Sequence, residues 1–211
     1  MIKKLFIVFL LFLLLGCKKI DINEDYASNV KNCLNDTKIT NNVALGYRYY
    51  IPKGVRKIKD YDYNQVFLVD DFTMYLYVDI ISYFYQEKQT SNREISGDYY
   101  YQPIEYQGKT GYLRIVQKDE DYFVTIEYHY SKIEVYTSKE SLSKVITMAS
   151  IILNSIDYND TVIEKVLEGD LGQFSEFTYE VDKPDDASSN FSQFLEEYVQ
   201  KEEEKEQLPG E

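Results

Sequence analysis

The stretch Tyr-Phe-Val-Thr-Ile-Glu-Tyr-His-Tyr, residues 122–130, decides the fold. One side of it carries Tyr122, Val124, Ile126, Tyr128 and Tyr130, and the other carries Thr125, Glu127 and His129. Side chains that alternate with a period of two indicate a strand with one buried face and one solvated face. Such a strand is typical of an antiparallel sheet that is covered on one side.

Further strands are predicted before this stretch, at residues 43–50, 64–69, 73–85, 99–106 and 112–118. The links 107–111 and 119–121 are short and polar, which suits tight hairpins. Ile51-Pro52-Lys53-Gly54 is a turn that ends the first strand, because proline cannot donate to a sheet. The pattern predicts an antiparallel meander.

Helices are predicted at three places in the same region. Residues 27–38 place Ala27, Val30, Cys33 and Leu34 on one side. Thr137-Ser138-Lys139-Glu140 fits a capping box, which would begin a helix that continues to about Asn154. Its apolar stripe, wide enough to cover a sheet, is Leu142, Val145, Ile146, Ala149, Ile152 and Leu153. A short helix follows at 160–168 and ends at Gly169.

The fold class predicted from these elements is α+β, an antiparallel β-sheet packed against α-helices. Residues 27–183 form this single domain, in which 174–181 are extended. Residues 184–211 are expected to carry an amphipathic C-terminal helix from about Ser189 and then an acidic, disordered tail.

The N-terminus has the pattern of an export signal. Lys3 and Lys4 precede an apolar run, Leu5 to Leu15, that is too short for the roughly 30 Å of a membrane core. Leu14-Leu15-Gly16-Cys17 follows, and it resembles the lipobox of bacterial lipoproteins. The resemblance implies that residues 1–16 are a signal peptide, that Cys17 carries a diacylglycerol, and that residues 17–26 are the lipidated cysteine and a tether. An ordinary signal peptide cleaved before a cysteine remains the alternative.

Charge and composition exclude some partners and indicate a compartment. Without Lys3 and Lys4, the mature chain keeps 21 basic residues against 36 acidic ones, a formal charge of −15. Nucleic acid is therefore excluded as a partner, because its phosphates require a basic surface. With 22 tyrosines and no tryptophan, the composition is typical of an AT-rich genome. The predicted location is the outer face of the cytoplasmic membrane of a Gram-positive bacterium.

Cys33 is the only thiol left once Cys17 is lipidated, so an internal disulfide is not possible. We expect Cys33 to be buried as a small apolar side chain. Pairing with a cysteine of another chain is the alternative.

A second resemblance concerns the domain. A strand, then Ile51-Pro52-Lys53-Gly54, a meander, and a helix that ends in Ile152-Leu153-Asn154-Ser155-Ile156 resemble Mog1/PsbP-type proteins over residues 41–156. The resemblance implies an antiparallel sheet between helices and a non-catalytic assembly or binding role. It assigns no active-site residue.

The motifs that could carry chemistry have simpler interpretations. Asp60-Tyr61-Asp62-Tyr63-Asn64 with Asp71 imitates a calcium loop, but Gln65 stands where the turn needs glycine, so a solvated acidic loop is expected. Gly108-Lys109-Thr110 is a hairpin turn and not a phosphate loop. The basic cluster of Lys53, Arg56, Lys57 and Lys59 is a solvated loop or a contact for phosphates.

No catalytic residue, metal ligand or cofactor site is predicted. His129 is the only histidine and is interpreted as a surface residue on the polar side of its strand. The adjacent acids Asp70 and Asp71 are a common turn pair. Tyrosine pairs and triplets at 49–50, 83–85 and 99–101 either complete the core or build a contact surface.

The functional hypothesis is a membrane-anchored extracytoplasmic lipoprotein that acts as a non-catalytic binding or accessory module. Its partner is an unknown envelope protein or glycan, bound through the sheet or the C-terminal helix. A carboxylate-dependent envelope hydrolase and a lipid or lipoprotein carrier are the alternatives.

Overall fold

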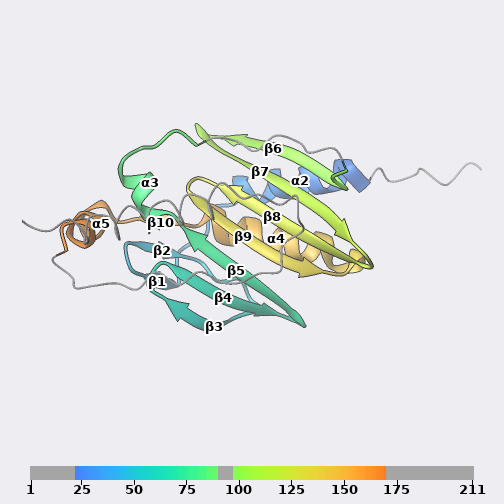
Figure 1. The fold of residues 1–211 in the computed structure, drawn as a ribbon, viewed down its shortest axis with the longest axis horizontal. Helices are drawn as coiled ribbons and strands as arrows, with labels where there is room; N and C mark the ends of the chain where they lie inside the picture. Colours follow the sequence, from blue (N-terminus) through green and yellow to red (C-terminus); the bar gives the residue numbers. More distant parts are fainter. Residues whose placement is uncertain (1–21, 90–96, 170–211) are drawn as a thin grey trace, which may run out of the picture.

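The computed structural model describes residues 22–89 and 97–169. A seven-stranded antiparallel sheet dominates this part of the chain, in the order β3-β4-β5-β9-β8-β7-β6 (Figure 1). Its strands are β3 (Val55–Tyr61), β4 (Asn64–Val69), β5 (Phe72–Val78), β6 (Tyr100–Tyr106), β7 (Lys109–Lys118), β8 (Asp121–Tyr128) and β9 (Ser131–Thr137). A small antiparallel sheet is formed by β1 (Asn42–Ala44), β2 (Tyr47–Tyr49) and β10 (Asp157–Tyr158).

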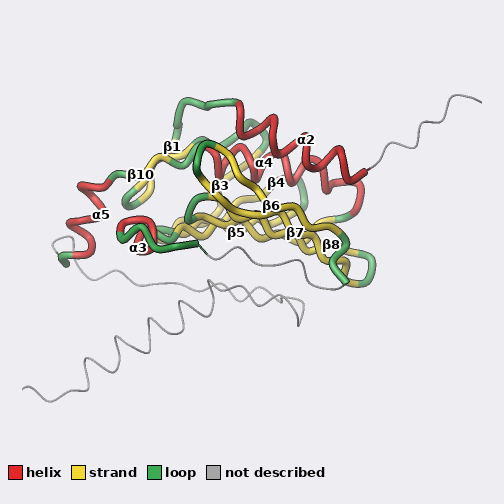
Figure 2. Tube along the Cα trace, turned by 90° about the horizontal axis from the view of Figure 1, so that it is seen from above, coloured by secondary structure: helices red, strands yellow, loops and turns green. Residues whose placement is uncertain are grey.

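The described helices are α2 (Ile22–Asn35), α3 (Ile80–Phe84), α4 (Leu142–Asn154) and α5 (Asp160–Leu167), with a 3₁₀ turn, η1 (Lys139–Ser141), before α4. In Figure 2, α2 and α4 lie side by side on one face of the large sheet, which we call the inner face. The α+β class, with an antiparallel sheet packed against helices, is confirmed.

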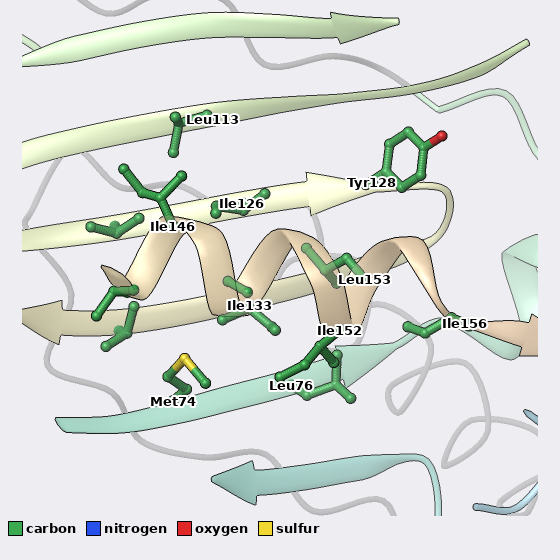
Figure 3. Packing of buried hydrophobic residues seen from close by; sticks show 14 of the residues in the cluster. Met74, Leu76, Leu113, Ile126, Tyr128, Ile133, Ile146, Ile152, Leu153 and Ile156 are labelled. Carbon is green, nitrogen blue, oxygen red and sulfur yellow. The ribbon is translucent and has the colours of Figure 1, made fainter. Parts of the chain in front are cut away.

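The core lies between α4 and the inner face. All six side chains of the predicted apolar stripe of α4 are buried. Ile146, Ile152 and Leu153 face Met74, Leu76, Leu113, Ile126 and Ile133 of the sheet (Figure 3). The small sheet covers the β4 side of this face, where the ring of Tyr49 lies edge-on to Phe67 at 6.1 Å.

The prediction of a single strand at residues 43–50 is wrong, because these residues lie in the hairpin β1–β2. The chain reverses at Leu45 and Gly46, and Gly46 has a φ of +83° that other residues rarely adopt. The predicted alternation of buried and exposed side chains is found only in β2, where Tyr47 and Tyr49 are buried. In β1, Val43 is 71% exposed.

The second half of the predicted strand 73–85 is also wrong. β5 ends at Val78, and α3 begins at Ile80. Asp79 caps this helix by accepting a hydrogen bond from the backbone N–H of Ser82 at 2.8 Å. The short carboxylate side chain of Asp79 thus caps α3 directly after the apolar run of β5 ends.

Three strands, β3, β9 and the two-residue β10, were not predicted. β3 is an edge strand, and it contains most of the basic cluster that was interpreted as a loop. Lysines on an edge strand are typical, because they oppose pairing with another chain. β9 lies in the middle of the sheet, where Lys132 and Glu134 are buried although their types favour solvent.

The beginnings of two helices differ from the prediction. Thr137 is the last residue of β9 and is 1% exposed, so the predicted capping box does not form; η1 lies between it and α4. α2 begins at Ile22 and not at Ala27, and Tyr26 is buried with its ring edge-on to Tyr100 at 5.4 Å. The predicted tether, 17–26, therefore overlaps the domain, because Tyr26 extends the apolar side of α2.

Other predictions are confirmed. α4 ends at Asn154, and α5 ends just before Gly169, whose φ is +77°. Cys33 is 6% exposed, and burial raises the pKa of its thiol. The signal peptide, Cys17, the segment 174–181 and the C-terminal helix and tail lie outside the described residues. Within 22–89 and 97–169, no helix is both long and apolar enough to cross a membrane.

Candidate functional site

Ionisable side chains gather on the face of the large sheet that is opposite α4, which we call the outer face. The strand register places Tyr112, Glu127, Lys132 and Tyr77 next to one another across β7, β8, β9 and β5. The adjacent row across the same strands contains Arg114, Thr125, Glu134 and Tyr75. We call these two sets the charged rows. Direct neighbours across a sheet have Cβ atoms about 5 Å apart, so the charges of the two rows interact.

The buried charges of these rows are paired. Lys132 Nζ lies 2.8 Å from Glu134 Oε1, and the two side chains are 2% and 1% exposed. The same ammonium lies 4.8 Å from the ring centre of Tyr77, at cation–π distance. Breaking a buried pair by removing one partner costs several kcal/mol, about 3–5 in measured cases, because the other charge is left buried.

Arg114 forms a second buried pair. Its Nε donates to Asp98 Oδ1 and Oδ2 at 2.9 and 3.0 Å, and its Nη2 donates to Oδ1 at 2.8 Å. A planar guanidinium that binds both oxygens of a carboxylate is a strong and directional contact. It fixes the segment that precedes the edge strand β6 to β7.

Glu127 differs from the other carboxylates of the charged rows. Burial raises its pKa to about 7, while the nearby Lys132 and a hydrogen bond from Tyr112 partly oppose the rise. The charges of Asp79 and Glu134 add to it. Near neutral pH this carboxyl group can therefore either donate or accept a proton.

This pKa predicts a pH dependence of stability. The unfolded chain ionises Glu127 near pH 4.5, whereas the folded chain keeps the proton up to about pH 7. The free energy of unfolding is therefore unaffected by this group below the pKa of the unfolded chain. It decreases as pH rises from about 4.5 to about 7, by on the order of 3 kcal/mol in total. Glu127→Gln should equal the natural protein at pH 4 and be more stable at pH 8, as measured by urea unfolding. A difference between the two proteins that does not change with pH would contradict the assignment.

His129 and Tyr130 form the turn between β8 and β9. Both have positive φ, +49° and +61°, in a turn position where Asn and Gly are usual. Hydrogen bonds hold it: Tyr158 Oη donates to the carbonyl of His129 at 2.9 Å, and the N–H of Asp79 donates to the carbonyl of Tyr130 at 2.9 Å. The N–H of His129 donates to Thr110 O at 3.0 Å. Residues held in such conformations cluster at functional sites.

Aromatic rings surround this turn. The His129 ring lies 5.9 Å from Tyr83, 5.7 Å from Tyr158 and 5.4 Å from Tyr130. Tyr83 and Tyr158 are stacked at 3.7 Å, and Tyr83 Oη donates to Asp160 Oδ1 at 3.0 Å. We call Tyr83, His129, Tyr130 and Tyr158 the aromatic end. It combines flat rings with hydroxyl groups, as contact surfaces for sugars or proteins do.

The surface position predicted for His129 is wrong in its details, because the residue lies in a turn and is half-buried among rings. Burial lowers its pKa to about 4, and the positive charge of Lys109 contributes. The imidazole is therefore neutral at pH 7, with one nitrogen that donates and one that accepts. Because the unfolded chain protonates His129 near pH 6.5, the free energy of unfolding decreases as pH falls from about 6.5 to 4. This pH dependence has the opposite sign to that of Glu127.

The predicted tyrosine groups lie in different parts of the structure. Tyr49 and Tyr100 belong to the core, at 0% and 9% exposure. Tyr83 belongs to the aromatic end, and Tyr85 nearby is 63% exposed. The structure thus brings together one predicted tyrosine group and the only histidine. Tyr158 and the charged rows were missed, although Lys132, Glu134 and Tyr136 alternate in the sequence as one face of a strand would.

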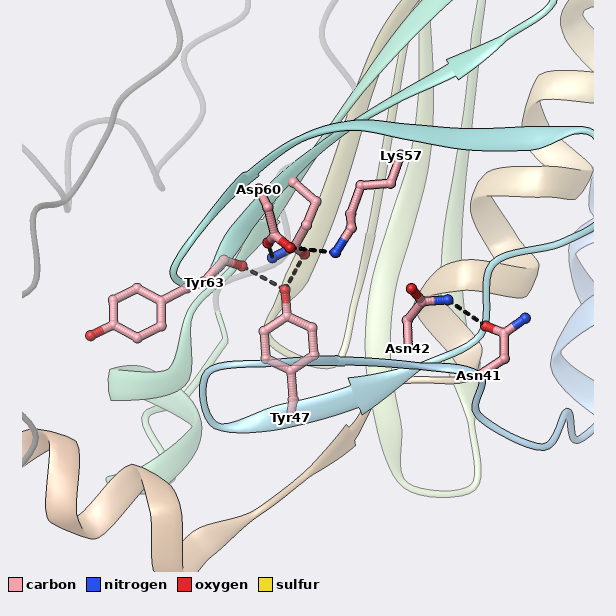
Figure 4. A network of polar contacts seen from close by, with 7 residues as sticks. Asn41, Asn42, Tyr47, Lys57, Asp60 and Tyr63 are labelled. Atoms are coloured by element: carbon pink, nitrogen blue, oxygen red, sulfur yellow. Dashed lines mark hydrogen bonds and ion pairs between the residues drawn. The ribbon is translucent and has the colours of Figure 1, made fainter.

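The calcium-like segment is a β3–β4 hairpin and not a loop. Asp60 accepts hydrogen bonds from Lys57 and, at 3.3 Å, from Gln65 (Figure 4). Gln65 in turn accepts from Tyr47 Oη, which also donates to Tyr63 O at 2.6 Å. Both carboxylate oxygens of Asp60 are used within the protein, so this segment is a structural network. Among the residues that the structure describes, no group of His, Cys, Asp or Glu is placed to hold a metal ion.

No protein-family model and no curated protein matches this chain. A crystal structure of a protein from Bacteroides thetaiotaomicron VPI-5482 is similar over 54% of this chain and 45% of that chain, at 10% identity and a TM-score of 0.32. This chain thus spans less than half the length of that protein.

Proposed function

We propose that this chain is a lipid-anchored extracytoplasmic protein that acts as a non-catalytic binding or accessory module. The observation that carries the proposal is the sequence Leu14-Leu15-Gly16-Cys17 after a basic start and eleven apolar residues. A diacylglycerol on Cys17 supplies two acyl chains, and two chains give stable anchoring where one binds reversibly. The anchored domain lies on the outer face of the cytoplasmic membrane.

The aromatic end is the contact surface that the geometry supports best. Its rings can stack on a sugar or pack on a protein side chain, and its neutral imidazole can hydrogen-bond to either. The acidic carboxylates nearby, Asp157 and Asp160, and the formal charge of −15 of the mature chain disfavour an anionic polymer. An envelope glycan or an envelope protein is the proposed partner, and nucleic acid is not.

The two alternative functions have less support. A carboxylate-dependent hydrolase needs two acids that reach a substrate, and Glu134 beside Glu127 is 1% exposed and paired with Lys132. A lipid carrier needs room between sheet and helix, and that layer is filled by the side chains of α4 and the inner face (Figure 3).

Cys17→Ser tests the anchor, because it replaces the sulfur that the lipid needs by oxygen. We expect the natural protein in the membrane fraction with an incorporated fatty-acid label, and the variant in the soluble fraction without label. Cys33→Ser is the matched control: it changes the same atom at a buried position and should leave fractionation and labelling unchanged. A Cys17→Ser variant that stays in the membrane and takes up label would contradict the proposal.

A further inference from the structure

Large side chains are buried on the outer face of the sheet, although no described helix covers that face. Of the described helices, α2 and α4 pack on the inner face, and α3 and α5 pack on each other at one end of the molecule (Figure 2). The strand register places five apolar or aromatic side chains on the outer face, apart from the core cluster of the inner face. At 8% exposure or less, they are Val66, Tyr77, Tyr112, Val116 and Phe123.

The charged side chains of the outer face are buried to the same degree. Lys132 and Glu134 are 2% and 1% exposed, and the side chain of Arg114 is 6% exposed. Side chains stand roughly perpendicular to a sheet, so neighbouring strands cover the sides of a side chain but not its outer end. On an open face the ammonium of Lys132 would stay hydrated, because taking a charge out of water is costly. A further layer of protein must therefore cover the outer face.

The chain outside the described residues offers three segments for this layer, 1–21, 90–96 and 170–211. Residues 1–21 lead into α2, which lies on the inner face. Residues 90–96 are seven and include one large apolar side chain, Ile95. Residues 170–211 are 42 and include ten large apolar or aromatic side chains before position 200: Leu171, Phe174, Phe177, Tyr179, Val181, Phe191, Phe194, Leu195, Tyr198 and Val199. The C-terminal segment is thus the one with enough apolar surface.

The predicted helix at 189–199 has the pattern and size for this position. Its apolar side carries Phe191, Phe194, Leu195 and Tyr198, and its polar side carries Gln193, Glu196 and Glu197. Eleven helical residues are about 16 Å long. The buried part of the outer face runs from β4 to β7, four strand spacings or about 19 Å. The helix therefore matches the width of the surface that needs a cover.

The connection from the described domain is long enough. α5 ends at Leu167, and the 21 residues from 168 to 188 extend to at most about 70 Å. β7, with ten residues, is about 33 Å long, so every point of the outer face is within reach.

Charge is also complementary. Residues 170–211 contain thirteen acidic and three basic residues. At the β3 edge of the outer face, Arg56 and Lys59 are exposed. The acidic residues that follow the predicted helix can thus lie beside a basic edge while its apolar side faces the sheet.

We infer that residues 170–211 fold back over the outer face, with the apolar side of 189–199 packed on the side chains of β4, β5, β9, β8 and β7. The charged rows are then interior, between the sheet and this segment. The inference goes beyond the proposed function and does not depend on the lipid anchor. It removes the outer face and the C-terminal helix from the candidate contact surfaces and leaves the aromatic end for a partner.

Thiol labelling of the full chain tests the cover. Thr125 lies on the outer face of the central strand β8 and is 6% exposed, so Thr125→Cys places a thiol under the proposed cover. With Cys17→Ser and Cys33→Ala, this thiol is the only one in the chain. We expect slow labelling by a maleimide. Phe194→Asp should speed it about tenfold or more, because losing a large buried side chain favours detachment by more than one factor of ten.

Gln193→Asp is the matched control, since it adds the same charge on the polar side of the predicted helix and should leave the labelling rate unchanged. Cys33, which is buried between α2 and the rest of the domain, reports global unfolding in a second protein that carries Cys17→Ser alone. Its labelling should stay slow when Phe194→Asp is added.

A sole tryptophan gives a second readout, because the natural chain has none. Phe194→Trp should emit at short wavelength and resist quenching by acrylamide, whereas Gln193→Trp should be quenched freely. If Phe194→Asp speeds the labelling of Cys33 as well, this comparison decides: a protected tryptophan at 194 supports the cover, and a freely quenched one overturns it.

Three results would overturn the inference directly. Unchanged labelling of Thr125→Cys in Phe194→Asp would mean that another segment covers the outer face. Fast labelling without Phe194→Asp would mean that the face is open to a partner. A labelling rate that rises when the protein is diluted would assign the cover to a second copy of the chain.

Discussion

Ile146→Asp is expected to unfold the domain. Ile146 is fully buried at the centre of α4 and faces the middle strands of the sheet (Figure 3). Removing its side chain alone costs about 2–5 kcal/mol, and burying an unpaired carboxylate adds several more. The sum is comparable with the whole stability of a typical domain, about 5–15 kcal/mol. Far-UV circular dichroism and urea unfolding should show no cooperative transition.

Lys144→Gln is the control on the same helix. Lys144 is exposed and pairs with Asp70, and a surface ion pair contributes at most about 1 kcal/mol. Its urea midpoint should stay close to that of the natural protein. If Ile146→Asp also unfolded at the natural midpoint, α4 would not be the helix that closes the core.

Residues 122–128 of β8 and helix α4 could be predicted because each has one apolar side and one more polar side, although the polar side of β8 is largely buried and not solvated as predicted. Hydrophobic burial is the dominant favourable term in folding, and its period appears directly in the order of residues. β9 was missed because Lys132 and Glu134 are polar yet buried. Their burial is made tolerable by each other and by neighbours on β5 and β8, which the local sequence of β9 does not contain.

The candidate site was predicted only in part, for a related reason. Tyr83 and His129 were each singled out as residues, but nothing in their spacing of 46 positions indicates that their rings lie 5.9 Å apart. The His129 turn has no glycine or asparagine to mark it, and its strained backbone is held by Tyr158 and Asp79, which are distant in the chain. Turns of this kind are set by tertiary contacts and are invisible to local rules.

Gly111→Ala is the other substitution with a large expected effect, and it acts on the backbone. Gly111 of β7 pairs with Tyr128 of β8. A Cβ atom there would lie 2.0 Å from the carbonyl oxygen of Glu127, 2.7 Å from its carbon and 2.9 Å from the Cα of Tyr128. Because these are backbone atoms, no side-chain rotation can relieve the clash, and β7 and β8 must separate.

The loss of unfolding free energy should be at least about 3 kcal/mol, the upper part of the range for overpacked interiors. The separation would also disturb both ends of the candidate site, since Glu127 and Thr110 flank the clash. We therefore expect the pH-dependent part of stability assigned to Glu127 to shrink in any fraction of the variant that still folds. Urea unfolding at pH 4, 6 and 8 measures both effects.

Gly108→Ala separates the clash from the loss of glycine itself. Gly108 lies in the turn before β7 with a φ of +74°, and a Cβ there would meet nothing within 4 Å. Alanine in this conformation costs about 1–2 kcal/mol and should leave the pH dependence unchanged. A Gly111→Ala variant no less stable than Gly108→Ala would mean that β7 and β8 approach less closely than the structure has them. The charged rows, whose alignment depends on that approach, would then have to be reassigned.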